Sequence, residues 1–157
     1  MKGFIMKKMA ISVLFCGALG ATLLPLQSAH SATTTDNTAL VTDYLHALFV
    51  DKDINKVEKY WGSTMIQHNP TLPDGHAVLR QIIGKLGPDF HYQQGLTMEK
   101  GNFVMVQGHY VGWGPKPMVG VDIFRIADGK VVEHWDVLQE EVPADKTASG
   151  HAMFPAQ

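Results

Sequence analysis

Three ionisable side chains interrupt two apolar, strand-like runs in the C-terminal part of the chain. They are Asp122, His134 and Asp136, within the stretch GVDIFRIADGKVVEHWDVLQ at residues 120–139. Strand interiors disfavour aspartate, and charged groups among apolar neighbours are costly unless they are paired or solvated. We therefore interpret the three groups as part of a pocket, provided that all of them share one face of a sheet.

The turn between the two runs decides which face each group occupies. A three-residue loop at 127–129, with its glycine in the left-handed conformation, would pair Ile126 with Lys130 and set Asp122 opposite His134. All three ionisable groups would then share one face. A two-residue Asp-Gly turn would shift the register by one and move Asp122 to the opposite face from the other two groups. The mixed apolar and charged face created by the longer loop suits a pocket, so we favour that loop.

Removal of a proton from a carbon beside a carbonyl group needs a base, a donor for the oxygen that gains charge, and a dry apolar cavity. We interpret Asp136 as the base, and His134, His109 or Tyr110 as the donor. The apolar wall is expected to come from Trp61, Phe103, Met105 and Phe124. A cross-strand ion pair between Asp122 and His134 that only fixes the register is the structural alternative.

The stretch IQHNP places His68 and Asn69 on a loop that could project over the mouth of the pocket. The alternative is ordinary turn chemistry, because an asparagine before a proline is common in turns. If His68, His109 and His134 converged with Asp122, they would suit zinc or another divalent transition metal. Their spacing is scattered and includes no histidine pair at helical spacing, so we predict neither a metal nor another cofactor.

Several other classes of function have little support in the sequence. There is no Gly-rich phosphate loop, no Ser-centred nucleophile elbow and no His-Glu-x-x-His helix. The chain holds 13 Lys and Arg against 15 Asp and Glu. Nothing basic clusters with aromatic residues in the manner of a strand-binding groove, so we expect no nucleic-acid partner.

The first 31 residues are typical of a secretory signal peptide. Lys2, Lys7 and Lys8 precede an apolar run at 9–24, and small residues favour cleavage near 31/32. Residues 32–157 are then expected to form a single domain, periplasmic or secreted, without membrane attachment after cleavage. The only cysteine lies in the leader, so the mature chain offers no thiol chemistry.

Hydrophobic periodicity indicates an α+β plan. Apolar residues recur at helical spacing over 36–50, 51–62 and 76–86, while 63–75 holds two prolines and a glycine and is expected to be loop. From residue 91 the period changes to two, and strands are expected around a turn at 100–102, and then on each side of the Asp128-Gly129 turn. This order predicts helices that cover one face of a curved antiparallel sheet.

The stretches IQHNPTLPDG, VDIFRIADGKVVEHWDVLQ and SGHAMF resemble the SnoaL-like branch of the nuclear transport factor 2-like superfamily. The resemblance covers nearly all of the chain after the leader. It implies a cone-shaped fold in which three N-terminal helices pack on a strongly curved, mainly antiparallel sheet that encloses a pocket. It also implies a homodimer, which is common in this superfamily. Because the superfamily includes non-catalytic members, the fold alone does not name a reaction.

The same resemblance implies roles for two residues. In polyketide cyclases of this group an acid in the last strand is the general acid/base of an intramolecular aldol condensation, and Asp136 matches that position. Asp122 stands where those enzymes have a histidine, and His134 could supply the missing proton donor. We therefore expect an exported, cofactor-independent lyase or isomerase that acts on a small carbonyl compound.

The alternative is a non-catalytic secreted binding module for a small lipophilic ligand. Export favours this alternative, because polyketide assembly takes place in the cytoplasm. The cluster of ionisable groups favours the enzyme, because a binding module gains little from three such groups on an apolar face.

Overall fold

Helices form the N-terminal part of the described chain. The computed structural model describes residues 36–154, so the predicted leader lies outside the described residues. The Asp36 carboxylate starts the first helix by accepting a hydrogen bond from the Ala39 amide at 2.9 Å. No helix within this range is long and apolar enough to cross a membrane. In chain order, the helical segments are α1 (Asn37–Leu45), the π-helical turn η1 (His46–Val50), α2 (Ile54–Val57), the 3₁₀ turn η2 (Glu58–Tyr60), α3 (Ala77–Lys85) and, near the C-terminus, the 3₁₀ turn η3 (Ala144–Lys146).

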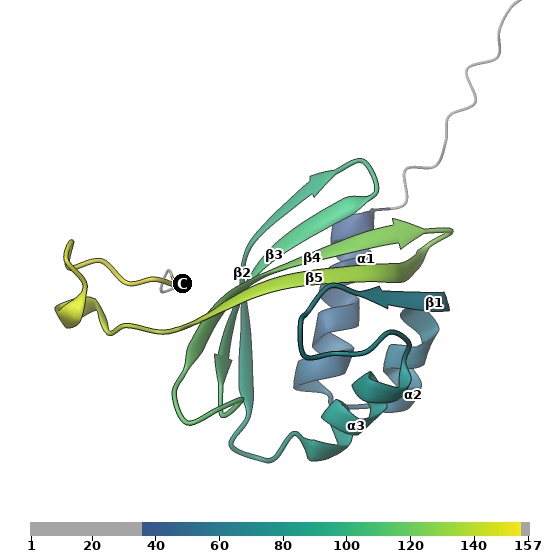
Figure 1. Cartoon of the computed structure of the whole chain (residues 1–157). Coiled ribbons are helices and arrows are strands. Elements are labelled where there is room, and N and C mark those ends of the chain that lie inside the picture. The colour runs from purple at the N-terminus through teal and green to yellow at the C-terminus, as the bar shows by residue number, and fades with distance from the viewer. Residues whose placement is uncertain (1–35, 155–157) are drawn as a thin grey trace, which may run out of the picture. The chain divides into compact units, whose positions relative to one another are not determined.

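Five strands form one curved sheet, and the helices lie against one of its faces (Figure 1). The order of strands in the sheet is β1-β5-β4-β3-β2. Neighbouring strands are antiparallel except β1 and β5, which are parallel. The predicted α+β class, with helices on a mainly antiparallel curved sheet, is therefore confirmed. The strands are β1 (Trp61–Gln67), β2 (His91–Lys100), β3 (Phe103–Val111), β4 (Met118–Ala127) and β5 (Lys130–Glu140).

Strand β1 was expected to be loop and the end of a helix, and this prediction is wrong. The prolines that suggested a loop, Pro70 and Pro73, lie beyond the end of the strand. The residues before them pair with the open edge of β5, and Gln67 lies beside His134. An edge strand needs a partner on one side only, so a short polar segment can occupy this position. β1 therefore brings Gln67 next to the ionisable groups of β5.

The turn between β4 and β5 also differs from the prediction. Asp128 and Gly129 both have left-handed backbones, with φ of 51° and 67°, and Ala127 pairs with Lys130. This is the two-residue turn with positive φ at both central positions, which matches the twist of a hairpin. The register then shifts by one at a β-bulge, where β5 carries the extra residue Val132.

A two-residue turn alone would put Asp122 on the opposite face of the sheet from His134 and Asp136, and the bulge brings it back to their face. Asp122 lies opposite Asp136, and His134 lies opposite Phe124. The predicted partners are therefore wrong by two residues. Because a shift of two restores the alternation of side chains, Asp122, His134 and Asp136 still share one face.

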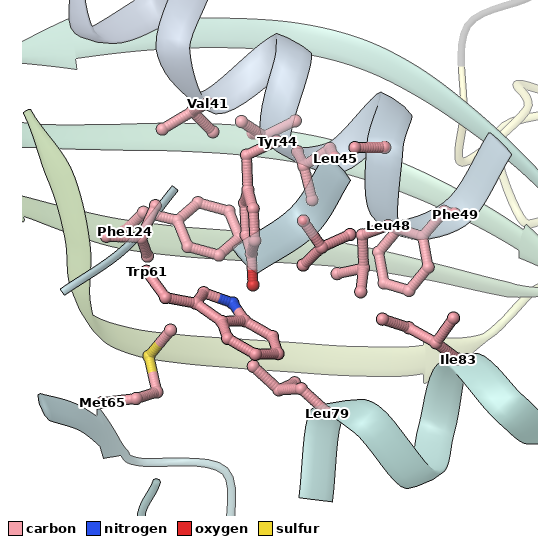
Figure 2. Packing of buried hydrophobic residues seen from close by; sticks show 14 of the residues in the cluster. Val41, Tyr44, Leu45, Leu48, Phe49, Trp61, Met65, Leu79, Ile83 and Phe124 are labelled. Atoms are coloured by element: carbon pink, nitrogen blue, oxygen red, sulfur yellow. The ribbon is translucent and has the colours of Figure 1, made fainter. Parts of the chain in front are cut away.

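The core lies between the helices and that face of the sheet. Val104 and Val106 of β3 are fully buried, as are Val41 and Leu45 of α1. Figure 2 shows side chains of α1 and η1 meeting Leu79 and Ile83 of α3, with the Tyr44 hydroxyl directed toward the indole of Trp61. The helices thus close the concave side of the sheet.

Candidate functional site

A cavity of about 120 Å³ lies between the sheet and the helices. We call it the pocket. Its polar side chains come mainly from β4, β5 and the segment that follows β1, and its apolar side chains come mainly from the helices. The polar lining consists of Tyr44, Gln67, Asn69, Thr71, Tyr110, Asp122, His134 and Asp136. The apolar lining consists of Leu45, Leu48, Phe49, Leu72, Leu79, Ile82, Trp113, Phe124 and Leu138.

The Asp136 carboxylate is held by a single amide group. Asn69 Nδ2 donates to both carboxylate oxygens, at 2.8 and 2.7 Å. The other end of that amide is also fixed, because Asn69 Oδ1 accepts from the backbone N and the Oγ1 of Thr71, at 2.7 and 2.6 Å. Thr71 thus determines which end of the Asn69 amide faces Asp136. The loop after β1 therefore orients a half-buried carboxylate in the pocket.

Asp122 is almost fully buried, with 5% of its surface exposed, and has two hydrogen-bonding partners. The Tyr110 hydroxyl donates to Oδ2, and His134 Nε2 lies 3.1 Å from Oδ1. Burial raises the pKa of Tyr110 well above its ordinary value, and the nearby Asp122 charge raises it further. Tyr110 therefore remains protonated and serves Asp122 as a hydrogen-bond donor.

His134 connects Asp122 to Gln67. Its Nδ1 lies 2.9 Å from Gln67 Oε1, an oxygen that can only accept, so Nδ1 carries a proton. Its Nε2 faces Asp122 Oδ1. A hydrogen bond between these atoms requires one more proton, carried by the imidazole or by the carboxyl group.

The pocket also contains a set of side chains that could ligate a divalent cation. Asp122, His134 and Asp136 each offer one ligand atom, and these atoms lie within 4.8 Å of one another. Carboxylate and imidazole ligands suit several divalent metals. In this structure Asp122 is hydrogen-bonded to His134 and Tyr110, and Asp136 is hydrogen-bonded to Asn69. A metal ion would have to displace these hydrogen bonds.

Two histidines named from the sequence lie outside the pocket. The His68 ring stacks on Trp135 with centroids 4.3 Å apart, and its Nε2 lies 2.8 Å from Glu133 Oε1. The hydrogen bond from His68, followed by that from Arg125, lowers the pKa of Glu133. His109 pairs with Glu141 at 2.9 Å. The odd-numbered side chains of β3, which include His109, point away from the helices. His68 stacks on Trp135, which lies on the same outer face of the sheet as Met105 and Ile123. Both positions correct the expectation that these histidines reach the pocket or converge with Asp122 on a metal.

Three of the expected wall residues also lie elsewhere. Trp61 belongs to the core, where it stacks on His76 with centroids 4.5 Å apart. Phe103 and Met105 are 40% and 37% exposed on the outer face of the sheet. Of the residues named from the sequence, the structure brings these to the pocket: Asn69, Tyr110, Asp122, Phe124, His134 and Asp136.

Sequence reasoning missed Gln67, Thr71 and Trp113, which also line the pocket. The prolines and the glycine of residues 63–75 predict a loop, which gives Gln67 and Thr71 no fixed direction. One signal could have suggested Gln67, because it is two residues before Asn69, and residues two apart in an extended segment lie on one side of the chain.

The comparisons with known proteins agree with this architecture. The model of the SnoaL-like domain family matches residues 41–134, which is more than half of the chain. The match includes Gln67, Asn69, Asp122 and His134, and it ends two residues before Asp136. A comparison with curated protein sequences finds no match.

Solved structures show the same fold at low sequence identity. An epoxide hydrolase of M. tuberculosis, described as LEH-like, has a TM-score of 0.55 and 19% identity over 65% of this chain and 81% of its own. An NTF2-like protein of unknown function from Cytophaga hutchinsonii has a TM-score of 0.53 and 17% identity, over 64% and 87% respectively. TsrD from Streptomyces laurentii has a TM-score of 0.54 and 18% identity, over 64% and 86%. With the family match, these likenesses establish that the chain belongs to the SnoaL-like domain family and has the nuclear transport factor 2-like fold.

Proposed function

We propose that this protein is an exported, cofactor-independent lyase or isomerase that uses Asp136 as general base on a small carbonyl compound. The observation that carries the proposal is the position of Asp136, whose two carboxylate oxygens are both held by Asn69 inside a largely apolar pocket. A carboxylate oriented in this way can receive a proton from carbon without first reorganising its surroundings. An apolar wall limits the water that would otherwise solvate the carboxylate.

The proposed reaction begins with proton transfer from carbon. Asp136 removes a proton from the carbon beside the carbonyl group, and the electron pair of that C–H bond moves to form an enolate. Asp122 and His134 are hydrogen-bonded to each other, and one ligand atom of each lies within 4.8 Å of one on Asp136. A proton held in this hydrogen bond limits the build-up of negative charge in the pocket. In an isomerisation Asp136 then returns its proton to another carbon of the conjugated enolate. In an aldol reaction the enolate carbon forms a bond to a second carbonyl carbon, the electron pair of that C=O bond moves to its oxygen, and Asp136 gives its proton to the resulting alkoxide.

Deuterium exchange tests this proposal without knowledge of the natural substrate. The protein is incubated in D2O with a panel of small ketones, and loss of the α-hydrogen signals is followed by proton NMR. We expect protein-dependent exchange of at least one compact ketone. A panel of ketones that bind to the pocket without any exchange above the buffer rate would contradict the proposed chemistry.

The second candidate function is a binding module for a small lipophilic ligand. It is favoured by the self-contained bonding of the polar residues, because Asp122 and His134 already have partners within the protein. The exchange experiment separates the two functions, since a binding module retains ketones and leaves their α-hydrogens in place.

Export is part of the proposal and rests on the N-terminal sequence. Three lysines precede an apolar run, and small residues surround positions 31 and 32. We expect the mature protein in the periplasm or the medium of a bacterial host. Its intact mass should correspond to a chain that begins close to residue 32. A protein that keeps residues 1–31 and stays in the cytoplasm would contradict export.

We also infer a homodimer formed through the outer face of the sheet. Met98, Met105, Ile123 and Trp135 form a row across four paired strands, and Met98 is 60% exposed. Val137 beside this row is 75% exposed. A contiguous exposed apolar surface on a sheet is typical of an interface, and a second copy presents the same surface across a twofold axis.

The substitution Met105→Glu places a charge in the middle of this row and is expected to convert dimers to monomers. Light scattering coupled to size-exclusion chromatography measures the change. Lys85→Glu, on α3 at the helical side of the sheet, is the matched control and should leave the mass unchanged. A wild-type protein that is monomeric at high micromolar concentration would contradict this interface.

A further inference from the structure

We propose that the pocket selects compact, uncharged molecules that carry a hydrogen-bond-accepting oxygen, and that Gln67 is the residue that receives this oxygen. The inference rests on the proposed function, because it names the class of substrate and a further residue of the same site. It follows from the charges that line the pocket, the bonding state of its polar atoms and its volume.

The charges that line the pocket disfavour anions. Two carboxylates belong to the wall, and no lysine or arginine does among the residues that the structure describes. Both arginines of the chain form ion pairs outside the pocket: Arg125 pairs with Glu133, and Arg80 pairs with Glu58. A carboxylate or phosphate ligand would be desolvated next to Asp136 without an opposing charge.

The bonding of the polar atoms also disfavours protonated amines. An ammonium group has three N–H donors, each of which needs an acceptor when it is buried. The side-chain oxygens of Gln67, Asn69 and Asp122 already accept hydrogen bonds or face a proton-bearing partner. Asp136 is the remaining carboxylate acceptor, and the helical side of the pocket is apolar. An amine would therefore have to share Asp136 with Asn69, and its other N–H groups would depend on hydroxyl oxygens such as that of Tyr44.

An uncharged oxygen acceptor completes the bonding of Gln67. The Nε2 of Gln67 is shielded from solvent and has no hydrogen-bond partner in the described part of the chain. Its Oε1 is held by His134, and its backbone N donates to Asp74 Oδ1 at 2.8 Å, so the residue is fixed at both ends. A buried donor without an acceptor is unfavourable. A ligand oxygen at this wall would relieve that penalty, and the ligand would then occupy the pocket that Asp136 also lines.

The volume limits the size of such a ligand. An apolar cavity of about 150 Å³ can take benzene, and the pocket measures about 120 Å³. The pocket is smaller than that cavity, so a single ring of about six or seven non-hydrogen atoms is the upper limit of size, and cyclohexanone is a probe at that limit. Cyclohexanecarboxylate and cyclohexylammonium have the same ring and differ in the charged group.

The experiment measures equilibrium binding of these three probes to the protein without its leader, by calorimetry or ligand-observed NMR at neutral pH. We expect cyclohexanone to bind at least tenfold more tightly than either charged probe. Gln67→Glu removes the two N–H donors at nearly the same size, and we expect it to weaken cyclohexanone binding at least tenfold. Gln139→Glu, the same change at an exposed position of β5, is the control and should leave binding unchanged.

Gln67→Met removes the amide without adding a charge, and it should also weaken cyclohexanone binding. Thermal unfolding verifies that both Gln67 variants fold. Equal or tighter binding of the carboxylate or the amine would overturn the selection for uncharged ligands. Full cyclohexanone affinity in folded Gln67→Met would overturn the role of Gln67. Cyclohexanone that binds as expected but does not exchange its α-hydrogens would contradict the proposed reaction and leave this inference standing.

Discussion

Asp136→Asn is expected to lower the rate of ketone α-hydrogen exchange by about 1,000-fold, within the range that positioned general bases contribute. The substitution keeps the size of the side chain and an oxygen that can accept from Asn69 Nδ2. It removes the group that receives the proton. Ligand affinity should stay within about threefold of the wild-type value, because an amide at this position still fills the same space.

The matched control for this prediction is Asp128→Asn. It makes the same chemical change at the exposed turn between β4 and β5, where the left-handed backbone of Asp128 is compatible with asparagine. Exchange should proceed at the wild-type rate in this variant. If Asp136→Asn kept more than a tenth of the wild-type exchange rate while folded, Asp136 would not be the base.

His134→Leu is expected to reduce the free energy of unfolding by about 3 kcal/mol, the size typical of removing one member of a buried pair. The His134 and Asp122 side chains are 12% and 7% exposed, so water cannot replace the lost partner fully. Asp122 would keep only Tyr110 as a donor while remaining next to Asp136. Urea denaturation followed by tryptophan fluorescence or circular dichroism measures the change.

A second substitution separates the lost pairing from lost packing. In Asp122→Asn/His134→Leu the buried carboxylate is gone, and the new amide oxygen can still accept from Tyr110. The double variant should be more stable than His134→Leu by about 1 kcal/mol or more, since contacting residues are coupled to this extent. If the double variant were less stable than the single one, the cost of His134→Leu would be a packing effect and not the loss of a charge partner.

Most of the fold could be predicted from hydrophobic periodicity. The helical spacing over 36–50 and 76–86 and the alternation after residue 91 correspond to α1 with η1, α3 and strands β2 to β5. The β1 strand could not be predicted in this way. Only Trp61 and Met65 of its residues are buried, and its position depends on the free edge of β5. Pairing with a distant edge is a tertiary effect that local pattern does not encode.

The candidate site was predictable only in part, because part of it depends on contacts that are distant in the sequence. The shared face of Asp122, His134 and Asp136 was correctly predicted, although it arises from a tight turn and a bulge at Val132 instead of a longer loop. Bulges of this kind have no reliable local signal and depend on twist and packing. Alternation could have suggested the side of the chain on which Gln67 lies, but not its contact with His134, which is 67 residues away in the sequence.

The most direct test of the account is a crystal structure of the protein without its leader, soaked with cyclohexanone. The account predicts the ketone in the pocket, with an α-carbon about 3.5 Å or less from an Asp136 oxygen and the ketone oxygen at the Gln67 amide. A ketone bound with its α-carbons turned toward the helices and its oxygen at Asp136 would contradict the assignment of Asp136 as the base.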